Sequence, residues 1–274
     1  NRADLYQSRR ETHTGLYHRS LRLSPRRERK EATLPEHTVK RYDEELDQMT
    51  GTILRMGGIV EQQLARAIEA LIKRDPELAA SVIADDEPVD QLEHEVDHLV
   101  MRLLALRQPM AVDLRLITAS LKISSDLERI GDYAANVAKR ASALSQVEPM
   151  RPVAVIPRMS QIVQTMIKDV LDAYMARDAG KALAVWRRDE EVDETYNSLF
   201  RELLTYMMED PRHITPCTHL LFIAKNIERM GDHATNVAET ITFLVTGTPL
   251  DEARPKGDTT PFATAPDDPG GNLD

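Results

Sequence analysis

The sequence contains one phrase twice, one hundred residues apart. Residues 128–138 read ERIGDYAANVA and residues 228–238 read ERMGDHATNVA, with eight of eleven positions identical. A second pair, RDPELAASVIADDEPVD at 74–90 and RDAGKALAVWRRDEEVD at 177–193, repeats at an offset of 103. This period is much longer than the roughly 20–50 residues of a solenoid unit. The repeat therefore predicts a duplicated domain.

Each copy has the pattern of three helices. Apolar residues between Leu46 and Leu71 recur every three to five positions, which is typical of a helix that faces a core. Comparable patterns predict helices at about 42–75, 76–107, 112–145, 158–177, 179–209 and 215–245. Pro88 lies inside the second of these and is expected to kink that helix rather than end it. No segment is predicted to be a strand.

The predicted fold class is therefore all-α, with two tandem, similar three-helix bundles from an internal duplication. The bundles are expected at 36–147 and 158–246, joined by a proline-containing linker at 148–157. Residues 1–35 are basic and show no sustained period, and residues 247–274 are rich in Pro, Gly, Asp and Thr. Such segments do not build a packed core. Both ends are expected to be disordered.

Charge and cysteine content argue against several classes of protein. The formal charge is −10, and because residues 1–30 carry +6, the remainder carries −16. A body this acidic is not expected to bind nucleic acid. The one cysteine, Cys217, cannot form an internal disulfide. With no apolar run near the ~20 residues of a membrane span and no secretory signal, we expect a cytoplasmic protein.

The repeated phrases place oxygen-bearing side chains in rows. Residues spaced four apart lie on one face of a helix. Each copy has a row of Glu, Asp and Asn on its last helix and an Asp pair on the helix before it. These are Glu128, Asp132 and Asn136 with Asp86 and Asp90 in the first copy, and Glu228, Asp232 and Asn236 with Asp189 and Asp193 in the second. A short turn joins the two helices, so we expect them to be antiparallel neighbours.

Carboxylates that face one another either stay apart in water or share cations. Oxygen ligands without Cys or His suit iron(III), manganese, magnesium or calcium. A solvated helix face is the common alternative for one acidic pair. Because the pattern recurs at four places that follow the repeat, we favour metal binding. Gly131 and Gly231 each cost their helix about 1 kcal/mol relative to Ala and are interpreted as points of close helix approach.

Other charged residues near the phrases have simpler interpretations. Arg129 and Arg229 follow the glutamates in both copies and are expected to form salt bridges that stabilise the bundles, rather than to contact a ligand. His94 and His98 do not repeat in the second copy. They are interpreted as residues of a polar helix face.

The stretches LRQPMAVDLRLITASLKISSDLERIGDYAANVAKR and ITPCTHLLFIAKNIERMGDHATNVAE resemble the two halves of the PhoU family of bacterial phosphate-signalling regulators. The resemblance covers about residues 40–245. It implies two three-helix bundles side by side, with multinuclear metal clusters held by the acidic motifs. Iron is the expected metal, with zinc, manganese or magnesium as alternatives. The ligands carried over by position are the eight carboxylates named above, together with Asn136 and Asn236.

The resemblance also implies a function. Family members are negative regulators of the phosphate-starvation response. They are adaptors that link the phosphate ABC transporter ATPase to a membrane sensor histidine kinase and modulate phosphate uptake. A homodimer is the expected assembly, and contact with the membrane is expected only through these partners. Residues 1–35 and the acidic tail have no counterpart in the family core.

Two other hypotheses remain. In the first, the chain is a metal-free structural adaptor, and the acidic rows are solvated. In the second it is a ferritin-like di-iron enzyme, which requires Glu-x-x-His on each of two helices. The chain has Glu95 and His98, but Ser198 and Arg201 stand at the repeat positions. A Gly-rich phosphate loop and a nucleophile elbow are also absent, so we expect no enzymatic activity.

Overall fold

The computed structural model describes residues 36–149 and 151–251, and this part of the chain is helical without strands. The α-helices are α1 (Glu36–Lys73), α2 (Pro76–Ala84), α3 (Glu87–Arg107), α4 (Ala111–Leu144), α5 (Ile156–Ala176), α6 (Ala179–Glu209) and α7 (Ile214–Thr246). Two short 3-10 helices, η1 (Arg151–Val155) and η2 (Pro211–His213), precede α5 and α7. The all-α prediction is confirmed.

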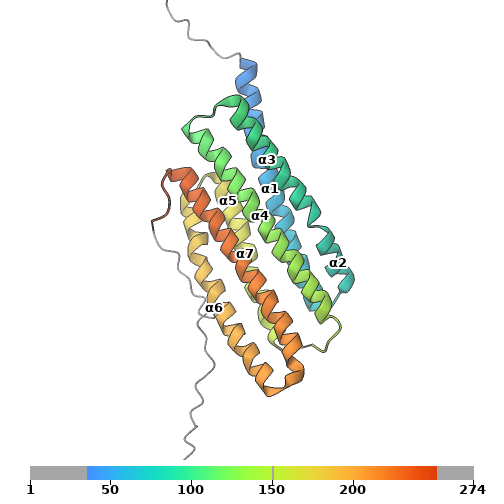
Figure 1. The fold of residues 1–274 in the computed structure, drawn as a ribbon. Coiled ribbons are helices and arrows are strands. Elements are labelled where there is room, and N and C mark those ends of the chain that lie inside the picture. Colours follow the sequence, from blue (N-terminus) through green and yellow to red (C-terminus); the bar gives the residue numbers. More distant parts are fainter. Residues whose placement is uncertain (1–35, 150, 252–274) are drawn as a thin grey trace, which may run out of the picture.

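The helices form two bundles that lie side by side (Figure 1). The first contains α1, the α2–α3 pair and α4, and the second contains α5, α6 and α7. The bundles meet mainly where α4 packs along α7 in antiparallel fashion, because Asp126 contacts His233 while Arg140 lies over the ring of Phe222. Helices α1 and α5 make a second contact.

A single hydrophobic core runs through both bundles. Along α1 the predicted stripe faces inward, and Met49, Ile53, Met56, Val60 and Leu64 are fully buried. Their spacing of three and four residues keeps them on one side of the helix. The same periodicity on the other helices places the acidic rows at the edge of this core.

The expectation for Pro88 was wrong, because the chain breaks into two helices there. Helix α2 ends at Ala84, and α3 begins at Glu87. Proline has no N–H to bond the carbonyl of Ala84, four residues earlier, and its ring would collide with that carbonyl. In the second bundle, α6 runs unbroken through the corresponding position, Glu191.

The described structure includes parts of the expected linker and tail. Within 148–157 it has η1 and the first two residues of α5. Helix α7 ends at Thr246 and is followed by its C-cap residue Gly247, which has φ 76°. Leu250 packs against the core, so the chain remains attached for a few residues past 246. The predictions of disorder for 1–35 and 252–274 lie outside the described residues.

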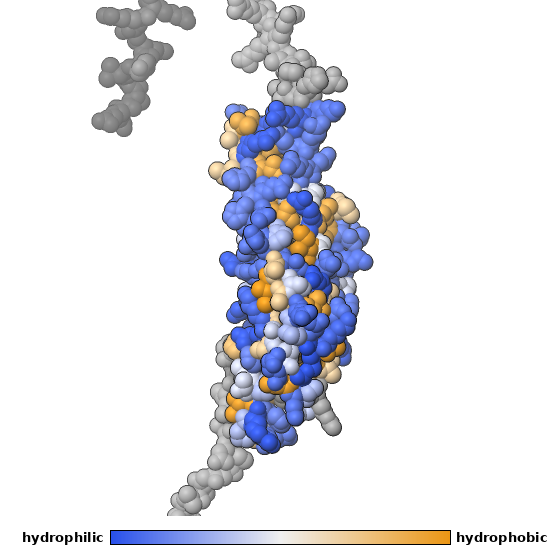
Figure 2. Space-filling view, turned by 90° about the vertical axis from the view of Figure 1, so that its right-hand side faces the viewer, coloured by the Kyte–Doolittle hydropathy of each residue, from blue (hydrophilic) through white to orange (hydrophobic). Residues whose placement is uncertain are grey.

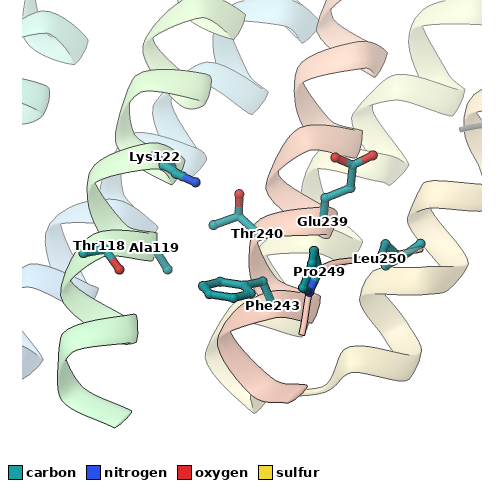
Figure 3. A pocket seen from close by; sticks show the side chains of 8 residues that line it. All are labelled: Thr118, Ala119, Lys122, Glu239, Thr240, Phe243, Pro249 and Leu250. Atoms are coloured by element: carbon teal, nitrogen blue, oxygen red, sulfur yellow. The ribbon is translucent and has the colours of Figure 1, made fainter. Parts of the chain in front are cut away.

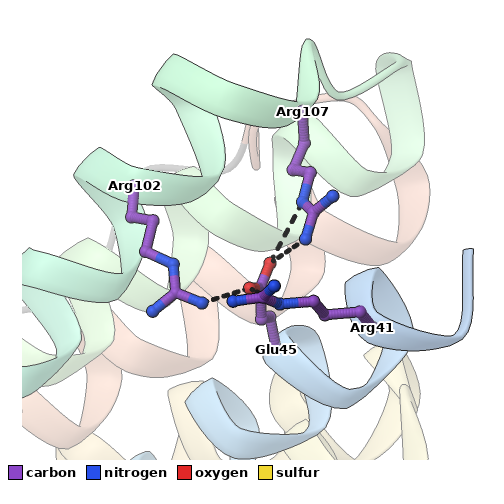
Figure 4. A network of polar contacts seen from close by, with 4 residues as sticks. All are labelled: Arg41, Glu45, Arg102 and Arg107. Carbon is purple, nitrogen blue, oxygen red and sulfur yellow. Dashed lines mark hydrogen bonds and ion pairs between the residues drawn. The ribbon is translucent and has the colours of Figure 1, made fainter. Parts of the chain in front are cut away.

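A buried carboxylate joins α1 to α3 at one end of the first bundle (Figure 4). Arg107 donates to Glu45 Oε2 through Nε and Nη2, both at 3.1 Å, and Arg102 donates to Oε1. Arg41, one turn earlier on α1, lies 3.5 Å from the same Oε1 atom.

One face of the molecule is mostly polar. On the face that Figure 2 shows, hydrophilic residues predominate and hydrophobic ones occur in small groups between them. Within residues 36–149 and 151–251, none of the helices combines the length and the apolar character that a membrane span requires.

Candidate metal sites

The first acidic site, Asp86, Asp90, Glu128 and Asp132, forms where the α2–α3 junction meets the middle of α4. Asp86 is at the N-cap position of α3, yet its side chain makes no capping hydrogen bond. Its Oδ1 atom would lie 3.5 Å from a methyl group added at Gly131. The Asp86 carboxylate therefore lies beside the backbone of α4 at Gly131, at a distance that a methyl group there would meet as an ordinary contact.

The carboxylates of Asp90 and Asp132 raise the pKa values of Asp86 and Glu128. Burial raises the pKa of Asp86, and the negative charges of Asp132 and Asp90 raise it further. Burial and then the charge of Asp132 raise the pKa of Glu128, against a smaller opposing effect of Arg129. The structure thus brings the four predicted carboxylates of this copy into one electrostatic cluster.

Two residues of the first site were missed by the sequence reasoning. Burial and neighbouring Asp97 and Asp90 raise the pKa of Glu93, which also acts on Glu128. Glu93 lies two turns from Asp86 on the same face, so its spacing could have indicated that it belongs to the site. Gln63 of α1 is 1% exposed, and neither its amide nitrogen nor its oxygen has a hydrogen-bond partner. Its Oε1 atom would lie 3.3 Å from a methyl group at Gly131.

The second acidic site, Asp189, Asp193, Glu228 and Asp232, has the same plan on α6 and α7. A methyl group at Gly231 would lie 3.6 Å from Asp189 Oδ1. Burial, with the charges of Asp232 and Asp193, raises the pKa of Glu228 to about 7, although a hydrogen bond from Lys225 opposes this shift. The Oε2 atom of Glu228 is buried without a hydrogen-bond partner.

Two further side chains contact the second site and were also missed. Lys225 Nζ donates to Glu228 Oε1 at 2.9 Å, and Thr235 Oγ1 donates to Asp189 Oδ1 at 3.3 Å. Neither type repeats in the first copy, where Ser125 and Ala135 stand at the matching positions. Reasoning from repeated residues therefore could not find them.

The two asparagines have different surroundings. Lys139 donates to Asn136 Oδ1 at 3.3 Å, on the surface of α4. Asn236 donates to Asp126 Oδ1 at 3.4 Å, and His233 Nδ1 lies 2.8 Å from the same oxygen. Asn236 thus takes part in the contact between the bundles, while the four carboxylates of its copy cluster between α6 and α7.

The arginines after the glutamates also differ between the copies. Arg129 lies 3.6 Å from Glu128 Oε2 and 3.5 Å from Asp132 Oδ2, so it forms the expected ion pairs within its own helix. Arg229 lies over the ring of Tyr133, 5.8 Å from its centroid, across the interface of the bundles.

The glycines of the two phrases are not needed for close backbone approach. A methyl group at Gly231 would meet Val192 Cγ1 at 3.5 Å, an ordinary contact distance. The close helix approach lies elsewhere, at Gly57 of α1, where a methyl group would be 2.3 Å from Leu171 Cδ1 on α5. In the acidic sites, the open space at each glycine lies beside an aspartate, Asp86 or Asp189.

The side chains of both sites fit a hard cation chemically. Their donors are carboxylate oxygens, which suit such ions. Gln63 and Glu228 add buried polar atoms without hydrogen-bond partners. At Gly131 and Gly231 there is space beside an aspartate that a Cβ atom would fill. However, no three His, Cys, Asp or Glu side chains in the described residues are arranged to hold an ion. Binding would therefore require side-chain rotation.

A pocket of about 500 Å³ lies away from the acidic sites, between α4, α7 and the segment after α7 (Figure 3). Lys122 and Glu239 line it together with Phe243 and Leu250. Trp186 Nε1 donates to Glu239 Oε1 at 2.9 Å and fixes that carboxylate. None of the predicted site residues lines this pocket.

These features define a class of all-helical proteins with two duplicated bundles, each carrying carboxylates between its last two long helices. The PhoU domain matches residues 53–141 and 156–241, which is more than half of the chain and includes all ten predicted site residues. The chain belongs to the PhoU family.

Individual relatives resemble the chain over most of its length. The phosphate-specific transport system accessory protein PhoU homolog of Caulobacter vibrioides is 57% identical over 226 residues, covering 82% of this chain and 98% of the relative. The Zymomonas mobilis homolog is 50% identical over 216 residues, covering 79% and 91%. The crystal structure of PhoU from Pseudomonas aeruginosa matches with a TM-score of 0.74 and 43% identity, covering 76% of this chain and all of that one. The family prediction is confirmed.

Proposed function

We propose that this chain is an accessory regulator of a phosphate-specific transport system. The observation that carries the proposal is the similarity to proteins of that name, which extends over nearly the whole Caulobacter relative and includes both acidic sites. The relatives are named as accessory proteins rather than as enzymes, which supports a non-enzymatic role.

The regulator acts negatively on the phosphate-starvation response. It binds the transporter ATPase and a sensor histidine kinase, and it keeps the kinase quiet when phosphate is plentiful. A binding protein achieves this without catalysis if its affinity for the kinase depends on the state of the transporter. We place it in the cytoplasm as a homodimer that reaches the membrane through these partners.

The two acidic sites hold metal ions, with iron the first candidate and zinc, manganese or magnesium the others. Asp86, Asp90, Glu128 and Asp132 provide the oxygens in the first bundle. Asp189, Asp193, Glu228 and Asp232 provide them in the second. A bound ion would supply the positive charge that allows these carboxylates to face one another. The glycines keep the space open, and the buried core fixes the helices that carry the ligands.

A reporter of the phosphate-starvation response tests the regulatory role. Deleting the gene for this chain in its host should switch the reporter on in phosphate-rich medium, and the wild-type chain should restore repression. A variant with Glu128→Gln, Asp132→Asn, Glu228→Gln and Asp232→Asn should fail to restore it.

The matched control is Asp43→Asn with Asp47→Asn, an exposed acidic pair on α1 with the same spacing but outside both sites. It should repress like the wild type. A reporter that stays silent after deletion of the gene would refute the regulatory role. Full repression by the fourfold variant would instead favour the metal-free adaptor.

A further inference from the structure

The duplication allows each residue of one acidic site to be compared with its counterpart in the other. Positions on α4 correspond to α7 at an offset of 100, and positions on α1 to α3 correspond to α5 and α6 at 103. The central carboxylates are the same in both halves. The residues that surround them differ in number of charges and in type.

The first site is the more acidic of the two. Glu93 adds a fifth carboxylate, whereas Tyr196 stands at the matching position of the second site. Gln63 also brings an amide oxygen that is buried beside Asp86 and has no partner. Its counterpart is Met166, a fully buried thioether, which is a poor ligand for a hard cation.

The second site already contains a cation. Lys225 Nζ donates to Glu228 Oε1 at 2.9 Å, and the side chains are only 30% and 6% exposed. The ammonium group also lies 4.9 Å from the centroid of the Tyr196 ring, which holds it in place. An ion pair shielded from water in this way is screened less than a surface pair.

The first site has a weaker counterpart of this arrangement. Arg129 lies 3.5 and 3.6 Å from its two carboxylate partners, but its side chain is 57% exposed. Exposed ion pairs contribute little to stability because water and salt screen them. The position that matches Lys225 is the exposed Ser125, which has no charge.

We propose that the two acidic sites are inequivalent and fill in order, which rests on the metal binding proposed above. The first site, with Gln63 as an additional oxygen ligand, binds a hard cation first. In the second site Lys225 is an internal counter-cation that competes with the metal for Glu228. The ammonium group leaves Glu228 when an ion binds there.

Titration of the full chain with Mn²⁺ tests this, with free Mn²⁺ measured by electron paramagnetic resonance. The wild type should show a tighter and a weaker class of sites. Lys225→Ser should strengthen the weaker class by about tenfold or more, because it removes a positive charge beside the ion. The tighter class should not change.

The reciprocal exchange is the matched control. Ser125→Lys, which introduces the second-site residue into the first site, should weaken the tighter class by a similar factor. Gln63→Met, which introduces the residue of the second bundle, should also weaken that class and leave the weaker one unchanged. Circular dichroism and thermal unfolding show whether each variant is folded.

Three results would overturn parts of the proposal. Equal affinities of all wild-type sites would refute inequivalence while metal binding stands. A weaker class that Lys225→Ser leaves unchanged would refute the competition between Lys225 and the metal. No Mn²⁺ bound by any folded variant would refute metal binding as well. The Mn²⁺ titration measures binding alone, so the regulatory role is tested separately by the phosphate reporter.

Discussion

Glu45 shows how one buried side chain depends on its neighbours. Burial alone raises the pKa of this carboxyl group, but hydrogen bonds from Arg102 and Arg107 outweigh that effect and hold the pKa below its usual 4.5. The ionised form is thus favoured in the folded protein. The stabilisation is fully present above the unfolded pKa and is lost as the pH falls through the lower folded pKa.

Glu45→Gln should therefore destabilise the protein mainly near neutral pH. We expect the free energy of unfolding to fall by about 1 kcal/mol at pH 7, since charge-assisted hydrogen bonds are lost. Below about pH 4.5 the carboxyl group of the unfolded chain gains a proton first, so the difference should shrink as the pH falls toward the lower folded pKa. Urea unfolding at pH 7 and pH 3.5 checks this, and a difference that grows in acid would contradict it.

Gly231 provides a second prediction at the residue scale. Gly231→Ala adds a methyl group at ordinary contact distances from Val192 and Asp189, so no clash follows. Because Ala favours a helix over Gly, stability should rise by up to about 1 kcal/mol. The methyl group occupies the cradle beside Asp189, so metal affinity of the second site should fall. The control is Gly51→Ala, which has open space around it and should increase stability without changing metal affinity. A loss of stability in Gly231→Ala would contradict the prediction that the added methyl group fits without a clash.

At the scale of elements, the crossing of α1 and α5 depends on one glycine. A methyl group at Gly57 would lie 2.3 Å from Leu171 Cδ1 and 2.6 Å from Cδ2. Leu171 is 8% exposed and belongs to the shared core, so it has little room to move. The neighbouring Gly58 faces open space.

Gly57→Ala and Gly58→Ala should therefore have opposite effects. Overpacking at Gly57 should lower the free energy of unfolding by about 1–3 kcal/mol. Gly58→Ala should raise it by up to about 1 kcal/mol through helix propensity. Chemical denaturation measures both. In a background of Leu171→Ala, the penalty at Gly57 should largely disappear; a penalty that persists would mean that Leu171 is not its cause.

The helices show what periodicity can and cannot predict. The apolar pattern predicted six helical segments, and for the first of them the stripe that includes Met49 and Leu64 predicted its inward side. The break before Pro88 was missed because the apolar pattern of one helix with a proline kink is the same as that of two helices that meet at the proline. The break follows from the missing N–H and the ring of Pro88, and Asp86 at the junction makes no capping hydrogen bond.

At the scale of the whole molecule, the two bundles share one core. Residues of both halves belong to a single buried cluster. Polar contacts such as those of Asp126 with His233 and Asn236 join α4 to α7. A half that unfolded alone would expose the faces of α4 and α1, or of α7 and α5, to water.

The two bundles should consequently unfold as one cooperative unit. Differential scanning calorimetry should give one transition whose calorimetric enthalpy equals the van't Hoff enthalpy. Two separate transitions, or a calorimetric enthalpy near twice the van't Hoff value, would show that the bundles are independent.

The candidate sites could be predicted only in part. Comparison of the two copies finds the residues that they share, but it does not find site residues that differ between them. The eight repeated carboxylates were found from their spacing, and the structure brings each set of four together. Gln63 escaped detection because it comes from α1, and Lys225 because its counterpart is Ser125. Such contacts depend on how the helices pack, which no spacing along one helix reveals.

The doubled phrase is, in our proposal, a doubled metal site. Its most direct test is elemental analysis of the full chain, purified without chelators, beside the variant Glu128→Gln, Asp132→Asn, Glu228→Gln and Asp232→Asn. We predict bound metal, iron foremost, in the wild type and its loss in a folded variant. Equal metal content in the two proteins, or none in either, would contradict the claim.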